Sequence, residues 1–182
     1  MEDYRLIKID KYWLLFAGLK LKEDKKVKDL FKIKEDEIIF QLINPRVFVG
    51  EEHLFAIISQ FLEAKKRSIL YTLKPELDLL IRFSLCDQIK EALDIAGVKD
   101  DDKEFIFIAL GEDERKLKNF YFLVLNSCIT RRELLEVDSE KLERIKRLFK
   151  ISDHVMSSLV GENERKKLSL VLAERASLLY KD

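Results

Sequence analysis

The sequence has few of the residues that break regular structure or bind metal ions. Its 182 residues include 5 glycines, 2 prolines, 2 cysteines and 2 histidines. So little glycine and proline indicates a compact, helix-rich fold with short loops. The two cysteines, Cys86 and Cys128, show no CxxC spacing, so they form no recognisable zinc or redox motif, and we expect both thiols to be reduced.

Net charge and long apolar runs are absent as well. Lysine plus arginine and aspartate plus glutamate each number 34, so the global charge gives no reason to expect a polyanionic partner. The longest apolar runs, such as residues 12–19 and 120–125, are shorter than the roughly 18 to 20 residues that a membrane span requires, and no signal peptide is evident. We therefore expect a cytoplasmic protein that forms one domain over residues 1–182.

Short apolar runs predict the strands. Residues 12–19 fit a strand buried on both faces, and residues 37–43 and 105–110 fit two more. Residues 6–9 fit an earlier strand. After the break at Asn44-Pro45, residues 46–49 could resume a strand, and residues 126–130 read as a loop or a short strand.

Apolar residues at helical spacing predict the helices. The clearest begins after Gly50 and carries an inward row, and the last, from about position 163 to 180, carries another. The rows are Leu54, Ile57, Ile58, Phe61 and Leu62, and Leu168, Val171, Leu172, Ala176 and Leu179. Further helices are expected within 20–36, from Pro75, from 87 to 97, through 120–125, over 138–149 and over 155–160. The order is not a regular βαβ alternation, so we expect an α/β fold with a small mixed sheet flanked by helices and a helical C-terminal third, and not a doubly wound fold.

The stretch from Arg82 to Gly97 joins two of these helices through a polar turn. Asp78 and Arg82 are spaced as a surface i, i+4 ion pair. Asp87 suits the N-cap of the following helix, and Gly97 suits a left-handed residue at its end. Polar side chains held between two apolar helices form a plausible binding edge.

No catalytic signature accompanies this edge. The sequence has no glycine-rich phosphate loop, HExxH, GxSxG or kinase motif set. His53, beside Glu51 and Glu52, is more simply a capping or ion-paired histidine than a catalytic one, and His154 suits a solvated turn. A small hydrolase that uses Cys86 or Cys128 with His53 remains an unfavoured alternative.

Acidic and basic clusters have ordinary explanations too. The acidic run 100–102 lacks the spacing of a calcium loop and reads as a solvated turn. Basic clusters occur at 65–67, 131–132, 144–150 and 165–167. They could converge on phosphates, but exposed helix faces paired with the many glutamates are the simpler interpretation at zero net charge.

The order of several short motifs resembles a known family. These are Leu42-Ile43-Asn44-Pro45, His53-Leu54 at a helix start, the segment from Asp78 to Arg82, Ser84, Gln88-Ile89, Glu91-Ala92-Leu93, Gly97 and Leu148-Phe149-Lys150-Ile151 before a final helix rich in Leu, Val and Glu. Together they resemble the PRPK-binding-protein (TPRKB-like) small subunit of the KEOPS tRNA-modification complex, of the archaeal type.

The resemblance implies a function. It implies a small non-catalytic α/β subunit without a cofactor or metal, which docks on the small atypical kinase of a hetero-complex and helps hold the 3′ end of tRNA. The complex makes threonylcarbamoyl-adenosine next to the anticodon. As RNA-facing candidates it suggests His53, Lys65, Lys66, Arg82 and Gln88. For the kinase we expect the outward Leu170 and Leu178 of the last helix.

One departure from the family pattern leaves an alternative open. Leu85-Cys86-Asp87 fills a gap where archaeal relatives usually carry small, polar or basic residues. The carboxylate of Asp87 would repel phosphate. A scaffold that binds the kinase without contacting RNA is therefore the second hypothesis.

Overall fold

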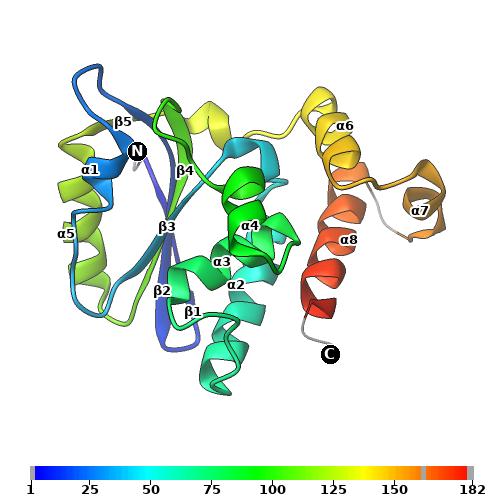
Figure 1. The fold of residues 1–182 in the computed structure, drawn as a ribbon, viewed down its shortest axis with the longest axis horizontal. Helices are drawn as coiled ribbons and strands as arrows, with labels where there is room; N and C mark the ends of the chain where they lie inside the picture. The colour runs from blue at the N-terminus through cyan, green and yellow to red at the C-terminus, as the bar shows by residue number, and fades with distance from the viewer. Residues whose placement is uncertain (1–2, 161–162, 180–182) are drawn as a thin grey trace. The chain divides into compact units, whose positions relative to one another are not determined.

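The computed structural model describes residues 3–160 and 163–179 and has an α/β fold (Figure 1). The described chain forms two compact units, each built from two separate chain segments. Of the described residues, 3–45 and 97–135 form the sheet unit, and 46–96, 136–160 and 163–179 form the helical unit. The single domain expected from chain length stays a prediction.

The sheet unit is built on an antiparallel sheet. Among the described residues its strands are β1 (Arg5–Ile9), β2 (Tyr12–Leu21), β3 (Ile39–Ile43), β4 (Glu104–Gly111) and β5 (Cys128–Thr130), in the order β1-β2-β4-β3 with β5 also on β2. Every recorded pair is antiparallel, where a mixed sheet was expected. Residues 12–16 of β2 pair with β1 and residues 19–21 with β5, so these two short strands pair with successive parts of β2.

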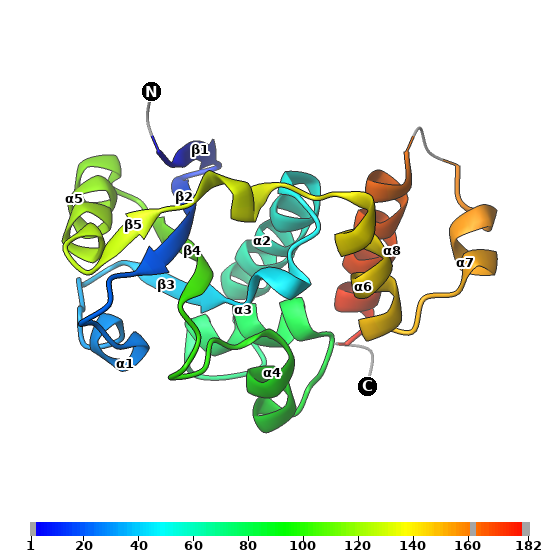
Figure 2. The same ribbon diagram turned by 90° about the horizontal axis from the view of Figure 1, so that it is seen from above.

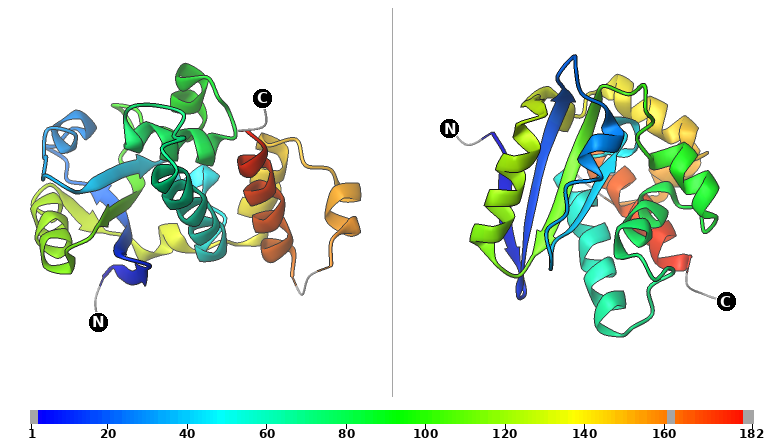
Figure 3. Two further views of the ribbon diagram at one scale, coloured as in Figure 1. Left: turned by 90° about the horizontal axis from the view of Figure 1, so that it is seen from below. Right: turned by 60° about the vertical axis from the view of Figure 1, so that its left-hand side comes forward.

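One face of this sheet packs against α5 (Glu114–Leu125) and the single-turn α1 (Val27–Leu30), as the right-hand view of Figure 3 shows for α5. Alternate residues of β2 and β4 point into this core, as the two-residue period of a strand requires. They are Leu15, Ala17, Leu19, Phe105, Phe107 and Ala109, and α5 adds Leu117, Phe120, Tyr121 and Val124. The predicted surface helix within 20–36 is thus only one turn long.

Gly18 allows a close backbone approach in the sheet unit. The Arg131 N–H donates to the Gly18 carbonyl at 2.8 Å, just before the 3-10 helix η2 (Arg132–Leu135). A Cβ atom on Gly18 would lie 2.1 Å from the Arg131 carbonyl oxygen. Only glycine fits here without movement of the backbone.

The helical unit contains α2 (Glu51–Lys66), α3 (Pro75–Ser84), α4 (Ile89–Ala96), α6 (Ser139–Leu148), α7 (Asp153–Ser158) and α8 (Glu164–Leu178), seen from above in Figure 2. Residues 45–47 form a 3-10 helix, η1 (Pro45–Val47), so the strand that could have resumed there is absent. Proline at its first position suits a helical turn, since the missing N–H has no intrahelical partner there.

Two polar contacts show that α2 and α8 run in the same direction. Arg165 Nη2 lies 3.0 Å from Glu52 Oε1, and Gln60 Nε2 donates to the Ala173 carbonyl at 2.8 Å. Both contacts join residues 113 positions apart. A constant separation along two helices means that they are parallel and in register.

Left-handed residues other than glycine close three helices of this unit. Ser68 and Lys150 have φ values of 57° and 52°, and Leu85, after α3, has 56°. After α2, the Ser68 and Ile69 amides donate to the carbonyls of Lys65 and Ala64, which is the Schellman pattern. The prediction for Gly97 is wrong, because Gly50 is the described glycine with positive φ.

The start of α4 also differs from the prediction. The Ala92 N–H donates to the Gln88 carbonyl at 2.8 Å, so Gln88 and not Asp87 occupies the N-cap position. Within the described residues, no helix is long and apolar enough to cross a membrane.

Candidate functional site

A buried ion pair lies at the start of the stretch that the sequence singles out. Arg82 is 1% exposed and Asp78 is fully buried, and Arg82 Nε lies 2.6 Å from Asp78 Oδ1. The sequence suggested a surface pair of this i, i+4 spacing. The pair is buried instead, and a buried guanidinium needs its carboxylate to compensate for its lost hydration.

The same carboxylate fixes the loop between α2 and α3, residues 67–74, here called the α2–α3 loop. Asp78 Oδ2 accepts the Tyr71 N–H at 2.7 Å. Thr72 Oγ1 accepts the Lys74 N–H at 3.1 Å and donates to the Lys74 carbonyl at 2.6 Å. The Schellman pattern closes the other end of the loop. These bonds give the loop a defined shape.

The α2–α3 loop carries exposed apolar side chains beside basic ones. Ile69 is 52% exposed and Leu73 is fully exposed, at 103%. Lys66, Arg67 and Lys74 are exposed nearby in the sequence, and Arg67 also pairs with Glu63. An ordered loop that presents aliphatic and cationic groups together is suited to binding rather than to chemistry.

The turn between α3 and α4 is held by its own side chains. Ser84 Oγ donates to the Ile81 carbonyl at 2.9 Å and accepts the Cys86 N–H at 3.2 Å. Cys86 Sγ lies 3.1 Å from Glu91 Oε2. Burial, followed by this carboxylate, raises the pKa of the Cys86 thiol, which disfavours the nucleophilic thiolate.

His53 is buried and unpaired. It is 1% exposed, neither ring nitrogen has a hydrogen-bond partner, and its ring lies edge-on to Phe83 with the centroids 5.5 Å apart. Burial lowers the pKa of His53 to about 4. The capping or ion-paired interpretation of His53 is therefore wrong. Its neutral imidazole is packed as part of the core.

This geometry does not assemble the Cys–His pair of the hydrolase alternative. Neither cysteine is bonded to His53, because both of its ring nitrogens lack a partner. Burial raises the pKa of the Cys128 thiol to about 12. His154 is exposed, as predicted. Among the described residues no group of three or more metal-ligating side chains comes together.

The predicted RNA-facing residues divide into two places. His53 and Arg82 are buried, so neither can face RNA in this structure. Gln88 is exposed in the turn that follows α3. This turn comes soon after Phe83, the residue of α3 whose ring contacts the ring of His53. Lys65 and Lys66 lie at the C-terminal end of α2. Lys65 comes twelve residues after His53, which is about 18 Å along the helix axis. Only the two lysines belong together, next to the α2–α3 loop.

The predicted kinase-facing residues lie where the helical period puts them. Leu168, Val171, Leu172 and Ala176 of α8 are buried, whereas Leu170 and Leu178 are 56% and 44% exposed. At about 100° per residue Leu170 lies opposite the buried row of α8, and Leu178 lies about 80° round the helix from Leu170, at the edge of that row. Whether they contact a kinase stays a prediction.

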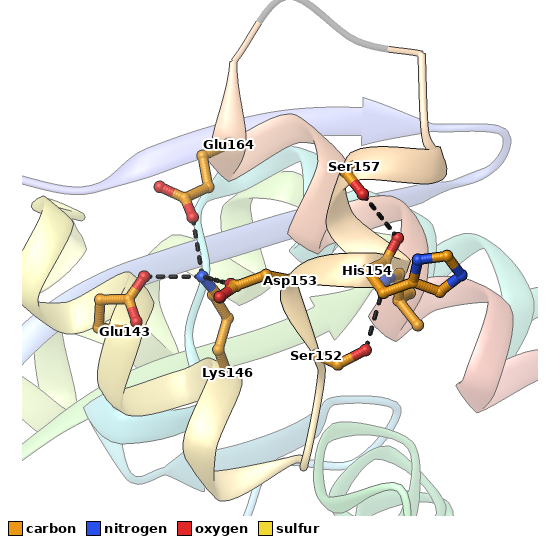
Figure 4. A network of polar contacts seen from close by, with 8 residues as sticks. Glu143, Lys146, Ser152, Asp153, His154, Ser157 and Glu164 are labelled. Carbon is orange, nitrogen blue, oxygen red and sulfur yellow. Dashed lines mark hydrogen bonds and ion pairs between the residues drawn. The ribbon is translucent and has the colours of Figure 1, made fainter.

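The sequence did not indicate that Lys146 lies inside a cluster of carboxylates. Lys146 Nζ lies 2.7, 2.8 and 3.1 Å from carboxylate oxygens of Glu143, Asp153 and Glu164 (Figure 4). Three acceptors from α6, α7 and α8 satisfy the three donors of the ammonium. The hydrogen bond to Asp153, followed by that to Glu143, raises the pKa of Lys146 above its usual range.

The other basic clusters are also paired in part. Arg165 contacts Glu52, and Arg131 contacts Glu133 at 3.3 Å. Arg132 lies 2.8 Å from Asp3, and Lys146 is the most buried member of the 144–150 cluster. The interpretation as helix faces paired with acids fits these contacts.

The fold and the surface of the described residues define the class of protein. It is an α/β protein with exposed apolar residues on several elements, among them the ordered α2–α3 loop and α8, as in proteins that bind other proteins. Residues 19–176 match the family described as kinase binding protein CGI-121, and the chain belongs to that family. No curated protein matches the sequence.

Proposed function

We propose that this chain is a non-catalytic subunit of a KEOPS-type complex in the cytoplasm. There it binds the small atypical kinase and helps to recruit tRNA by its 3′ end for threonylcarbamoyl-adenosine formation next to the anticodon. Membership of a kinase-binding family supports the first part, and the motif order described above supports the second.

The outward face of α8 carries the kinase part of the proposal. Leu170 and Leu178 are about half exposed on a helix whose other large apolar residues are mostly buried. Apolar side chains of this kind become the central anchors of an interface when a partner covers them. The face is therefore our candidate docking surface for the kinase.

Co-purification with the kinase subunit tests this surface. We expect the wild-type chain to retain the kinase, and a Leu170→Glu/Leu178→Glu variant to lose at least tenfold in affinity, because two anchors become charged. Leu148→Glu on α6 is a matched control, since that leucine is 37% exposed and outside the face. Equal kinase affinity for all three chains would rule the α8 face out.

The tRNA part depends on Lys65 and Lys66 at the end of α2, since the other two basic or polar candidates in α2 and α3 are buried. A mobility-shift assay should show weaker binding after removal of the 3′ CCA. Lys66→Glu should weaken binding further, because a phosphate contact is lost. Lys90→Glu, an exposed lysine of α4, is the control.

A kinase-binding scaffold without RNA contact is the second candidate. It is favoured by the burial of Arg82 and by the exposed carboxylate of Asp87 at the turn that otherwise resembles the family. Kinase binding with no tRNA shift at any protein concentration would select this alternative. Absence of both partners would contradict both candidates.

A further inference from the structure

A partly buried lysine lies in the first turn of α6, within the helical unit. The Lys141 Nζ atom lies over the ring of Phe48, 5.4 Å from its centroid, and Phe48 is itself fully buried. Nζ also donates to the Glu136 carbonyl at 3.1 Å. Both of these contacts are with neutral groups. The ring takes the place of water on one side of the amine, which disfavours its charged form.

Two charged side chains act on this amine from its own helix. Asp138 is the N-cap of α6 and accepts the backbone N–H of Lys141 at 2.7 Å, so its carboxylate lies close by and favours the ammonium. Arg144, one turn further along, pairs with Glu140 at 3.3 Å and disfavours a second cation. Burial is the largest influence, and it lowers the pKa of Lys141 to about 8.

Lys146 shows the opposite environment on the same helix. Its Nζ lies against three carboxylates, which hold it as an ammonium ion. At pH 7 about a tenth of Lys141 is the neutral amine, against about one part in 3,000 for a lysine with the ordinary pKa of 10.5. The neutral amine is the nucleophilic form, so the structure singles out Lys141 as a reactive lysine.

We propose that the Lys141 amine is a site at which acyl phosphates acylate this chain without an enzyme. The Nζ lone pair attacks the carbonyl carbon of the donor, and the new N–C bond forms as the C–O bond to the phosphate breaks. Inorganic phosphate leaves with the electron pair of that bond, and Nζ gives a proton to solvent. The product is a neutral amide, and no group is oxidised or reduced. The guanidinium of Arg144 suits an anionic donor.

The expected preference follows from the two effects of a lowered basicity. At pH 7 the neutral fraction favours Lys141 over an ordinary lysine by about 300-fold, while the weaker basicity reduces its nucleophilicity by roughly tenfold, on a slope like that of thiols. The cover of the Phe48 ring slows approach further. We therefore expect a preference of at least about tenfold. The proposal depends on neither kinase nor tRNA, so it stands apart from the proposed function.

Brief treatment of the full chain with acetyl phosphate, followed by peptide mapping in a mass spectrometer, measures this preference. Lys90 on α4 is the exposed comparator. We expect Lys141 to be acetylated at least about tenfold faster than Lys90 at pH 7, and the ratio to fall to one or below at pH 10, where both amines are largely neutral. In urea the ratio should also fall to about one, since the Phe48 contact is lost. Equal acetylation at pH 7, or a ratio that does not change with pH, would overturn the proposal.

Two variants that keep the lysine shift its reactivity in opposite directions. Asp138→Asn keeps an N-cap acceptor but removes the charge that favours the ammonium, so acetylation of Lys141 at pH 7 should rise about two- to fivefold. Arg144→Gln removes the opposing cation, so acetylation should fall by a similar factor. Arg147→Gln makes the same charge change six residues beyond Lys141, about 9 Å along α6, and should leave acetylation unchanged.

The signs of these changes decide the matter. No change in either Asp138→Asn or Arg144→Gln, or a change of the same sign in both, would show that the surroundings of Lys141 do not set its reactivity, and the proposal would fail. Circular dichroism melting of each variant checks that it is folded.

Discussion

The buried pair Asp78–Arg82 gives the sharpest test of the structure. Asp78→Ala removes the carboxylate that lies 2.6 Å from the Arg82 guanidinium and leaves a buried positive charge. Removal of one partner of a buried pair costs about 3–5 kcal/mol. Such a loss is a large part of the roughly 5–15 kcal/mol that stabilises a typical domain.

The chain supplies a matched control for this change. Arg67 and Glu63 have the same i, i+4 spacing and the same 2.6 Å distance, but their side chains are 65% and 50% exposed. Water compensates such a pair when one partner is removed, so Glu63→Ala should cost at most about 1 kcal/mol. Distance and helical spacing are thus held constant, while burial and the additional Tyr71 hydrogen bond of Asp78 differ.

A double variant separates charge from packing. Asp78→Leu/Arg82→Met replaces both charges by apolar side chains, which is often nearly neutral for a buried pair. The Tyr71 N–H still loses its acceptor, so about 1–3 kcal/mol should remain as the cost. The double variant should therefore be more stable than Asp78→Ala.

Equilibrium unfolding in urea, followed by circular dichroism, measures these free energies. The expected order of stability is wild type, Glu63→Ala, the double variant and then Asp78→Ala. If Asp78→Ala cost no more than Glu63→Ala, the pair would be exposed as the sequence first suggested. The α2–α3 loop would then also lack the buried Asp78 acceptor that holds the Tyr71 N–H.

Four other changes test separate parts of the structure. Gly18→Ala should lower the free energy of unfolding by about 3 kcal/mol in urea titrations, because its Cβ would overlap the Arg131 carbonyl. An unchanged free energy of unfolding would mean that the Arg131 carbonyl lies further from Gly18. His53 has a pKa of about 4 when folded and 6.5 when unfolded, so stability is fully present above pH 6.5 and falls by about 3 kcal/mol as the pH drops through 4. A His53→Leu variant should lose that pH dependence in urea midpoints measured from pH 7 to 4, and an equally steep dependence in the variant would contradict the assignment. Lys150→Gly should raise stability by about 1 kcal/mol, because glycine adopts the left-handed conformation without strain; a lower melting temperature would oppose this. Lys146→Met should speed amide hydrogen exchange in α7 relative to Lys146→Arg, since α7 loses its ionic contact to α6, and equal exchange would show that the contact does not hold α7.

Several elements were predictable because their information is local. The apolar run of β2, the apolar β4 and the periodic rows of α2 and α8 each repeat with the period of their own structure, and all four form where expected. Proline at the start of α3 and the break at Asn44 were local signals too. The strand expected at 46–49 does not form. A segment of four residues is too short for its own pattern to decide between a strand and a turn, so its neighbours decide.

The candidate site was less predictable, and Arg82 and Lys146 show why. Both are basic residues in helices, where an exposed position is the usual one. The sequence shows the spacing of Asp78 and Arg82 but not that both side chains are covered. Lys146 meets Asp153 and Glu164 only because α7 and α8 return to α6.

The sequence by itself determined β2, β4, α2 and α8, the exposed positions of Leu170 and Leu178, and the motif order of a kinase-binding family. These depend on spacing within one segment, which periodicity records. Tertiary structure alone decided that Arg82 and His53 are buried, that α2 and α8 run parallel, and that an ordered loop presents Leu73 to solvent. Burial and pairing of this kind arise from residues far apart in the chain, so no local pattern encodes them.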